Sequence, residues 1–167
     1  MRERPTWERR YVRGPGESII SAISVGAVFI LFGLIYVLAL PNNLGDSIFR
    51  FFGSLTGRQV PGIGITLPAP IPPNGHAVFY NAFFQFSLGI AFLQILILAL
   101  RIGFGSRVPK IAETVGTLIF WFGASYLVNM YLNSSTTLNT WFTFWAAILI
   151  VLGLSIVARA AVLISKR

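Results

Sequence analysis

The sequence predicts an all-α membrane protein: four transmembrane helices in an up-down-up-down bundle, with a short amphipathic helix in the first outer loop. Three observations predict it. First, 55% of the 167 residues are hydrophobic and only 11% are charged, whereas about a quarter of the residues of a soluble domain are charged. Second, the hydrophobic residues are gathered in four runs, each long enough to cross a hydrocarbon core roughly 30 Å thick. Third, the basic residues lie mostly at the ends of these runs.

The first predicted transmembrane helix covers residues 19–40 and follows a basic segment, residues 1–17. Pro41 ends it, because proline removes a backbone donor and collides with the preceding turn. The run is too long for a typical signal-peptide core, so an uncleaved first span is favoured over a cleaved leader. It contains no ionisable group, which indicates a helix that serves for packing.

Residues 41–75 form the predicted outer loop. Its first part, residues 44–55, predicts a short amphipathic helix on the membrane surface or over the mouth of the bundle. Its second part is rich in Pro and Gly and cannot form a regular helix. Alternation at Ile63, Ile65 and Leu67 predicts a brief extended segment, and residues 68–73 are expected to be polyproline-like and exposed. The apolar face of the predicted helix consists of Leu44, Ile48, Phe51, Phe52 and Leu55.

The second predicted transmembrane helix, residues 77–100, is the most polar of the four. A row of polar side chains runs along one stripe, and Asn81 and Gln85 form a second polar face. Buried polar groups need partners, so this helix is predicted to be the central one. Two interpretations of the row remain: hydrogen bonds that set helix register, or side chains that face a ligand or ion. The row consists of His76, Tyr80, Ser87, Gln94 and Arg101.

The remaining chain predicts a cytoplasmic turn (residues 101–113), a third transmembrane helix (114–132), an outer turn (133–139) and a fourth transmembrane helix (140–164). Trp141 and Trp145 are expected to anchor the start of the fourth at the membrane interface. Small residues recur at seven-residue spacing in all four runs, which predicts close, left-handed packing. These candidate packing residues are Gly26, Gly33, Ala82, Gly89, Gly116, Gly123, Ala146, Gly153 and Ala160.

The distribution of basic residues predicts the orientation. Of thirteen Lys and Arg, only Arg50 and Arg58 fall in the predicted outer segments. Positively charged short loops stay in the cytoplasm, so both termini are expected to be cytoplasmic, with the chain integral to the plasma membrane. Glu113 and Arg159 are expected at the cytoplasmic boundary, where long side chains reach water. The positions of the basic residues at the ends of apolar runs argue against a nucleic-acid partner.

The residue types present argue against a self-contained enzyme. The chain has one His and no Cys, and none of the predicted spans contains an acidic residue. Acid–base catalysis needs a positioned His or carboxylate, and metal sites need about three or four converging ligands, so we expect no catalytic residue, metal or cofactor. The sequence therefore favours a non-catalytic, accessory or structural subunit that contacts the lipid bilayer and other membrane subunits or copies of itself. Two alternatives remain: a small homo-oligomeric channel or transporter that uses the polar row, and a membrane enzyme that requires a partner subunit.

Overall fold

The computed structural model describes residues 15–165, so residues 1–14 of the predicted basic segment, with Lys166 and Arg167, lie outside the described residues. The predicted all-α class with four long apolar helices is confirmed. The helices α1 (Pro15–Ala39), α3 (Ala77–Gly103), α4 (Val108–Tyr131) and α5 (Leu138–Ile164) are the long ones. Each belongs to a segment long and apolar enough to cross a membrane.

Local chemistry sets the ends of these helices. After α1, the 3₁₀ turn η2 (Leu40–Asn42) contains Pro41, and Asn43 follows in the left-handed region with φ of 51°. Gly105, at φ of +63°, turns the chain between α3 and α4, a conformation that glycine adopts without steric cost. The side chain of Thr137 accepts a hydrogen bond from the Thr140 backbone N–H at 3.2 Å and caps the start of α5. Such caps satisfy a donor that has no partner within the helix.

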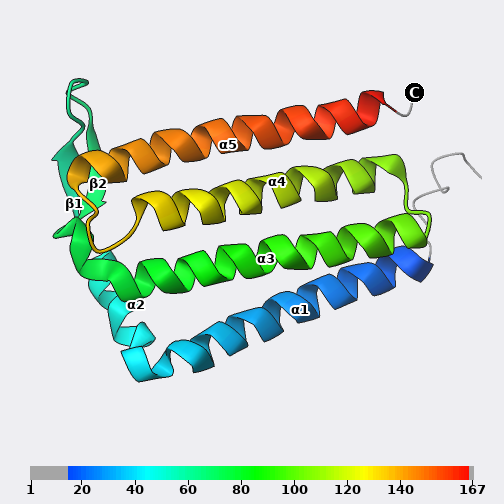
Figure 1. Ribbon diagram of the computed structural model, residues 1–167, viewed down its shortest axis with the longest axis horizontal. Coiled ribbons are helices and arrows are strands. Elements are labelled where there is room, and N and C mark those ends of the chain that lie inside the picture. Colours follow the sequence, from blue (N-terminus) through cyan, green and yellow to red (C-terminus); the bar gives the residue numbers. More distant parts are fainter. Residues whose placement is uncertain (1–14, 166–167) are drawn as a thin grey trace, which may run out of the picture.

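The four long helices lie in a single row, in the order α1, α3, α4 and α5 (Figure 1). Successive long helices run in opposite directions along this row. Each packs on its neighbours in the row, and within residues 15–165 there is no comparable packing of α1 on α4 or α5. This arrangement differs from a bundle closed around one centre. Both α3 and α4 therefore have two helical neighbours. In the most apolar stretch of each helix, 39% of the residues of α4 are buried, against 22% of those of α3.

The short elements lie together at one end of the long helices, which we call the hairpin end (Figure 1). Here α2 (Leu44–Gly53) is followed by β1 (Leu55–Gln59) and β2 (Thr66–Pro70), which pair antiparallel, and by the 3₁₀ turn η3 (Pro73–His76). The extended segment expected around residues 63–67 thus forms partly in β2, and it has a partner strand that the sequence analysis did not predict. Ala69 and Pro70 are buried, unlike the exposed polyproline stretch expected there, because the hairpin lies against α5.

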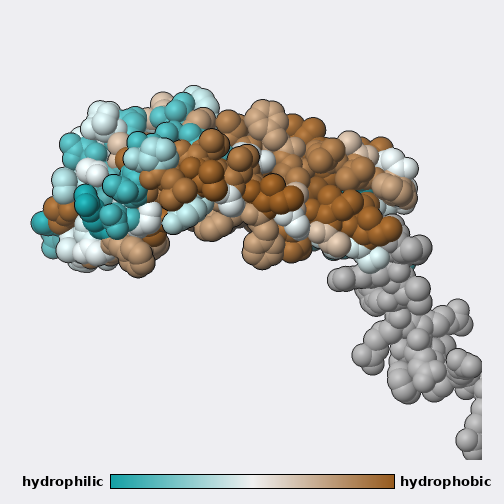
Figure 2. Space-filling view, turned by 90° about the horizontal axis from the view of Figure 1, so that it is seen from below, coloured by the Kyte–Doolittle hydropathy of each residue, from teal (hydrophilic) through white to brown (hydrophobic). Residues whose placement is uncertain are grey.

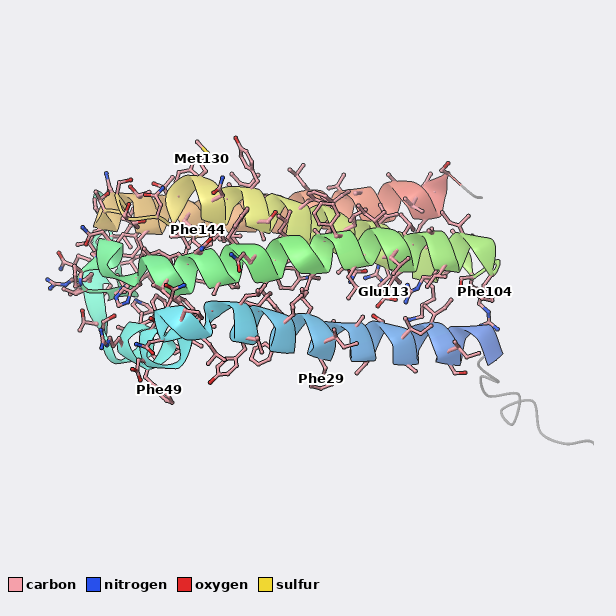
Figure 3. All side chains as sticks on the ribbon, turned by 60° about the horizontal axis from the view of Figure 1, so that its bottom comes forward. Phe29, Phe49, Phe104, Glu113, Met130 and Phe144 are labelled. Atoms are coloured by element: carbon pink, nitrogen blue, oxygen red, sulfur yellow. The ribbon has the colours of Figure 1, made fainter. Side chains whose placement is uncertain are left out.

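The packed core is concentrated at the hairpin end. Its buried cluster joins α2, β2, α3, α4 and α5 through Phe51, Ala69, Tyr80, Leu127, Val128, Leu132, Trp141, Phe142 and Phe144. Hydrophilic residues gather over this end, whereas hydrophobic residues cover most of the rest of the visible face (Figure 2). Phe29 of α1 is 72% exposed and points away from the row (Figure 3). Large apolar surfaces of this kind are stable in lipid rather than in water.

Candidate functional site

Three members of the predicted polar row form hydrogen bonds within the protein. The Ser87 hydroxyl, fully buried, donates to the Phe83 carbonyl of its own helix at 2.6 Å. The Tyr80 hydroxyl donates to the Pro73 carbonyl at 2.8 Å. His76 Nε2 and the Ser54 hydroxyl form a hydrogen bond of 3.0 Å, which links η3 to the end of α2. His76 and Tyr80 therefore connect neighbouring segments, whereas the Ser87 hydroxyl bonds within its own helix.

The other two members of the row lie farther along α3. Arg101 donates from Nη1 to the Thr114 hydroxyl at 2.6 Å and to the Lys110 carbonyl, so it fastens the turn between α3 and α4. Gln94 is half-buried, and within residues 15–165 its amide has no hydrogen-bond partner. The row is thus distributed along the whole of α3 and does not converge on one site.

The second polar face lies beside a groove between α1 and α3. Asn81 and Gln85 line this groove together with apolar side chains such as Leu38 and Ala82. The groove has a volume of about 580 Å³. Both amides are exposed, and neither has a hydrogen-bond partner in the described part of the chain. They are available to a group that comes from outside this chain.

A polar pocket of about 300 Å³ adjoins the groove at the hairpin end. Its charged lining residues are Asp46 and Arg50 of α2, and the start of α3 also lines it. The pocket and the groove share Asn42, Ala77 and Val78 in their linings. Asp46 and Arg50 are absent from the predicted apolar face of this helix, but the sequence did not predict the pocket, because it depends on how α2 lies against α3.

An apolar hollow of about 660 Å³ lies among α3, α4, α5 and the hairpin end. We call it the aromatic hollow, because rings make up much of its lining. Phe144, labelled in Figure 3, is one of these rings. The chain has fifteen phenylalanines, but sequence spacing did not bring these particular rings together. The lining rings include Phe51, Phe79, Phe83, Trp121, Trp141, Phe144 and Trp145.

The two predicted boundary charges, Glu113 and Arg159, lie toward the end of the long helices that is opposite the hairpin end. Glu113 of α4 (Figure 3) forms an ion pair of 2.9 Å with Lys110, and both side chains are about half exposed. Arg159 is exposed on α5, and its Cβ would lie 3.4 Å from a Cβ built at Gly116. An exposed ion pair of this kind contributes little stability, about 0–1 kcal/mol.

The predicted small residues divide into two groups. At Gly89, Gly116 and Gly123 an added Cβ would approach the neighbouring helix within 3.0 Å, and Ala82 is buried. These four lie at helix contacts. The other small residues lie on exposed helix surfaces: Gly26, Gly33, Ala146, Gly153 and Ala160.

Within residues 15–165, no three His, Asp or Glu side chains come together as metal ligands would. No protein-family model, curated protein or solved structure matches this chain.

Proposed function

We propose that this chain is a non-catalytic subunit of a larger membrane complex and that a helix of a partner protein packs over the aromatic hollow. The observation that carries this proposal is the open helix row. The long helices pack pairwise along a row, so the hollow among α3, α4 and α5 has no further long helix among residues 15–165 to close it. A surface of this shape is what an additional transmembrane helix would cover.

Packing explains why the hollow favours a partner. In a bilayer, lipid tails are as apolar as the helices, so helix association depends on close packing and polar contacts rather than on the hydrophobic effect. Side chains around an unfilled hollow lose dispersion contacts on one side. A shaped partner helix restores those contacts, and aromatic residues are enriched at protein interfaces for the same reason.

The proposal includes the orientation expected from the basic residues. Both termini would be cytoplasmic, and the hairpin end would lie on the outer side of the plasma membrane. Arg50 and Arg58, the two basic residues outside the cytoplasmic segments, both belong to the hairpin end.

A homo-oligomeric channel lined by the polar row receives less support from the geometry. A pore-lining row must present its polar groups to water or ions. Here the Tyr80 and Ser87 hydroxyls donate to carbonyls of this chain and are almost wholly buried. Only Gln94 in that row lacks a partner among residues 15–165.

The test is purification in mild detergent from the native membrane, followed by mass determination and identification of what copurifies. We expect a stable complex that contains a protein of different sequence. Trp145→Ala, at the half-exposed rim of the hollow, should release that protein while the purified chain keeps its helical content. Leu149→Ala is the matched control, since Leu149 is exposed on the same helix but does not line the hollow.

A homogeneous complex of identical copies, with no second protein in stoichiometric amount, would contradict the subunit role. Equal retention of the companion by the Trp145 and Leu149 variants would place the interface elsewhere than the hollow.

A further inference from the structure

The polar pocket and the groove between α1 and α3 form one continuous depression on the side of α3 that faces α1. The pocket, of about 300 Å³, lies at the hairpin end, and the groove, of about 580 Å³, continues from it along the helices. Asn42, Ala77 and Val78 line both. The lining changes along this path from charged and polar side chains to mainly apolar ones.

The pocket carries one charge of each sign. Asp46 and Arg50 lie four residues apart on α2, so they belong to one face of that helix. Both are exposed, and the sole ion pair among residues 15–165 is Lys110–Glu113. Neither charge is therefore neutralised by a salt bridge within the described chain. The remaining titratable group of the lining, His76, is engaged with Ser54.

The start of α3 adds a site for negative charge. Ala77 and Val78, the first residues of α3, also line the pocket, and the 3₁₀ turn η3 runs directly into them. The positive end of the helix dipole favours negative charge near these residues. A guanidinium group pairs with phosphate through two parallel hydrogen bonds, so Arg50 complements this site.

The groove below the pocket offers two unpartnered amides, of which Asn81 lies near the depth of a lipid's glycerol linkage and Gln85 lies deeper. At 1.5 Å per residue, Asn81 and Gln85 lie about 6 and 12 Å along α3 from its start. The 27 residues of α3 span about 40 Å, longer than a hydrocarbon core of about 30 Å, so its first turns reach the interfacial layer. Amide N–H groups there can donate to the ester or ether oxygens of glycerol. Leu38, Ala39 and Ala82 supply apolar walls for a hydrocarbon chain.

We infer that α1, α2 and α3 bind a phospholipid whose headgroup carries both a phosphate and an ammonium group. The phosphate lies at Arg50 and the start of α3, the ammonium group lies at Asp46, and one hydrocarbon chain lies in the groove between α1 and α3. The charge pattern selects this class, because a purely anionic headgroup would meet the unpaired carboxylate of Asp46. The inference requires membrane insertion but does not depend on the subunit role.

The test is native mass spectrometry of the full chain in detergent, titrated with phosphatidylethanolamine and, separately, with phosphatidylglycerol. We expect preferential retention of phosphatidylethanolamine. Arg50→Gln should weaken its binding by roughly tenfold or more, the effect of losing one charge-assisted pair. Asp46→Asn should reduce or reverse the preference for phosphatidylethanolamine over phosphatidylglycerol. Arg58→Gln is the matched control, because Arg58 is exposed on β1 and does not line the pocket. This variant should bind phosphatidylethanolamine as tightly as the unmodified chain does.

Two results would overturn the inference. If the unmodified chain and both pocket variants bound the two lipids equally well, Asp46 and Arg50 would not form a headgroup site. Competition by soluble phosphoethanolamine as strong as that by the lipid would show that the groove contributes nothing and that a membrane lipid is not the ligand. Because the titration measures lipid retained on this chain, a negative result leaves the search for a companion protein unaffected.

Discussion

At the scale of residues, Phe51 and Trp141 connect the hairpin end to the long helices. The Phe51 ring stacks on Phe79 at 4.3 Å and meets the His76 ring edge-on at 5.3 Å, so it attaches α2 to the start of α3. The Trp141 indole N–H donates to the Pro68 carbonyl at 3.1 Å and attaches β2 to α5. Both tryptophans at the start of α5 were predicted as interfacial anchors. Trp141 is buried in the core, whereas Trp145 is half exposed at the rim of the aromatic hollow.

The hydrogen bond of Trp141 gives a prediction at this scale. Trp141→Phe keeps an aromatic ring but leaves the Pro68 carbonyl without its donor, which should lower the free energy of unfolding by about 1–3 kcal/mol. Trp145→Phe is the control, because the Trp145 indole makes no hydrogen bond among the described residues, and it should change stability by less than about 0.5 kcal/mol. Denaturant titration in detergent measures both. Equal losses in the two variants would mean that the hydrogen bond contributes nothing beyond ring packing.

At the scale of elements, glycines determine how closely neighbouring helices approach. A Cβ at Gly123 of α4 would lie 2.4 Å from Cγ1 of Val151 on α5, and one at Gly116 would lie 3.0 Å from the Ser155 carbonyl oxygen. Valine is stiff about its first side-chain torsion, so it cannot move aside easily. By contrast, a Cβ at Gly153 of α5 would meet nothing within 4 Å. Sequence spacing alone treated these glycines as equivalent.

The contrast predicts different responses to the same substitution. Gly123→Ala should force α4 and α5 apart and destabilise the protein by about 1–3 kcal/mol. Gly153→Ala should be neutral or slightly stabilising, within about 1 kcal/mol, because alanine has the higher helix propensity and space is available. Thermal unfolding followed by circular dichroism in detergent measures the difference. A Gly153 variant as unstable as the Gly123 variant would contradict this view of the α4–α5 contact.

At the scale of the whole molecule, the row of helices carries the two surfaces for which we propose functions. The depression between α1 and α3 is mixed polar and apolar, whereas the aromatic hollow among α3, α4 and α5 is apolar. Both reach the hairpin end, where short elements hold the long helices together. We therefore assign lipid binding to one surface and partner binding to the other.

The proposed orientation is tested with single cysteines, because the natural chain has none. A maleimide that does not cross membranes should label Ile63→Cys, between the two strands, in intact cells. It should label Phe104→Cys, between α3 and α4, only after the membrane is opened. Both native side chains are exposed, so access to the reagent decides the result. The opposite pattern would place the basic segments outside, against the distribution of Lys and Arg.

The hydropathy of the sequence by itself determined that the chain has four long apolar helices, and Pro41 marked where the first one ends. Both follow from local chemistry, since run length and backbone propensity act within a single segment. Local chemistry also located the polar side chains on α3, but not their partners. Ser87 and Tyr80 donate hydrogen bonds to carbonyls of this chain, whereas Asn81 and Gln85 line an open groove.

Only the tertiary structure decided the order of the helices, the hairpin and the pockets. An apolar helix surface has the same composition whether it meets lipid or another helix, so hydropathy cannot distinguish a row from a closed bundle. Likewise, β1 carries Gly57, Arg58 and Gln59, a weak strand pattern, and it forms because β2 lies opposite and supplies its hydrogen bonds. Contacts between segments far apart in the chain placed Arg50 beside the start of α3 and Trp141 beside Pro68.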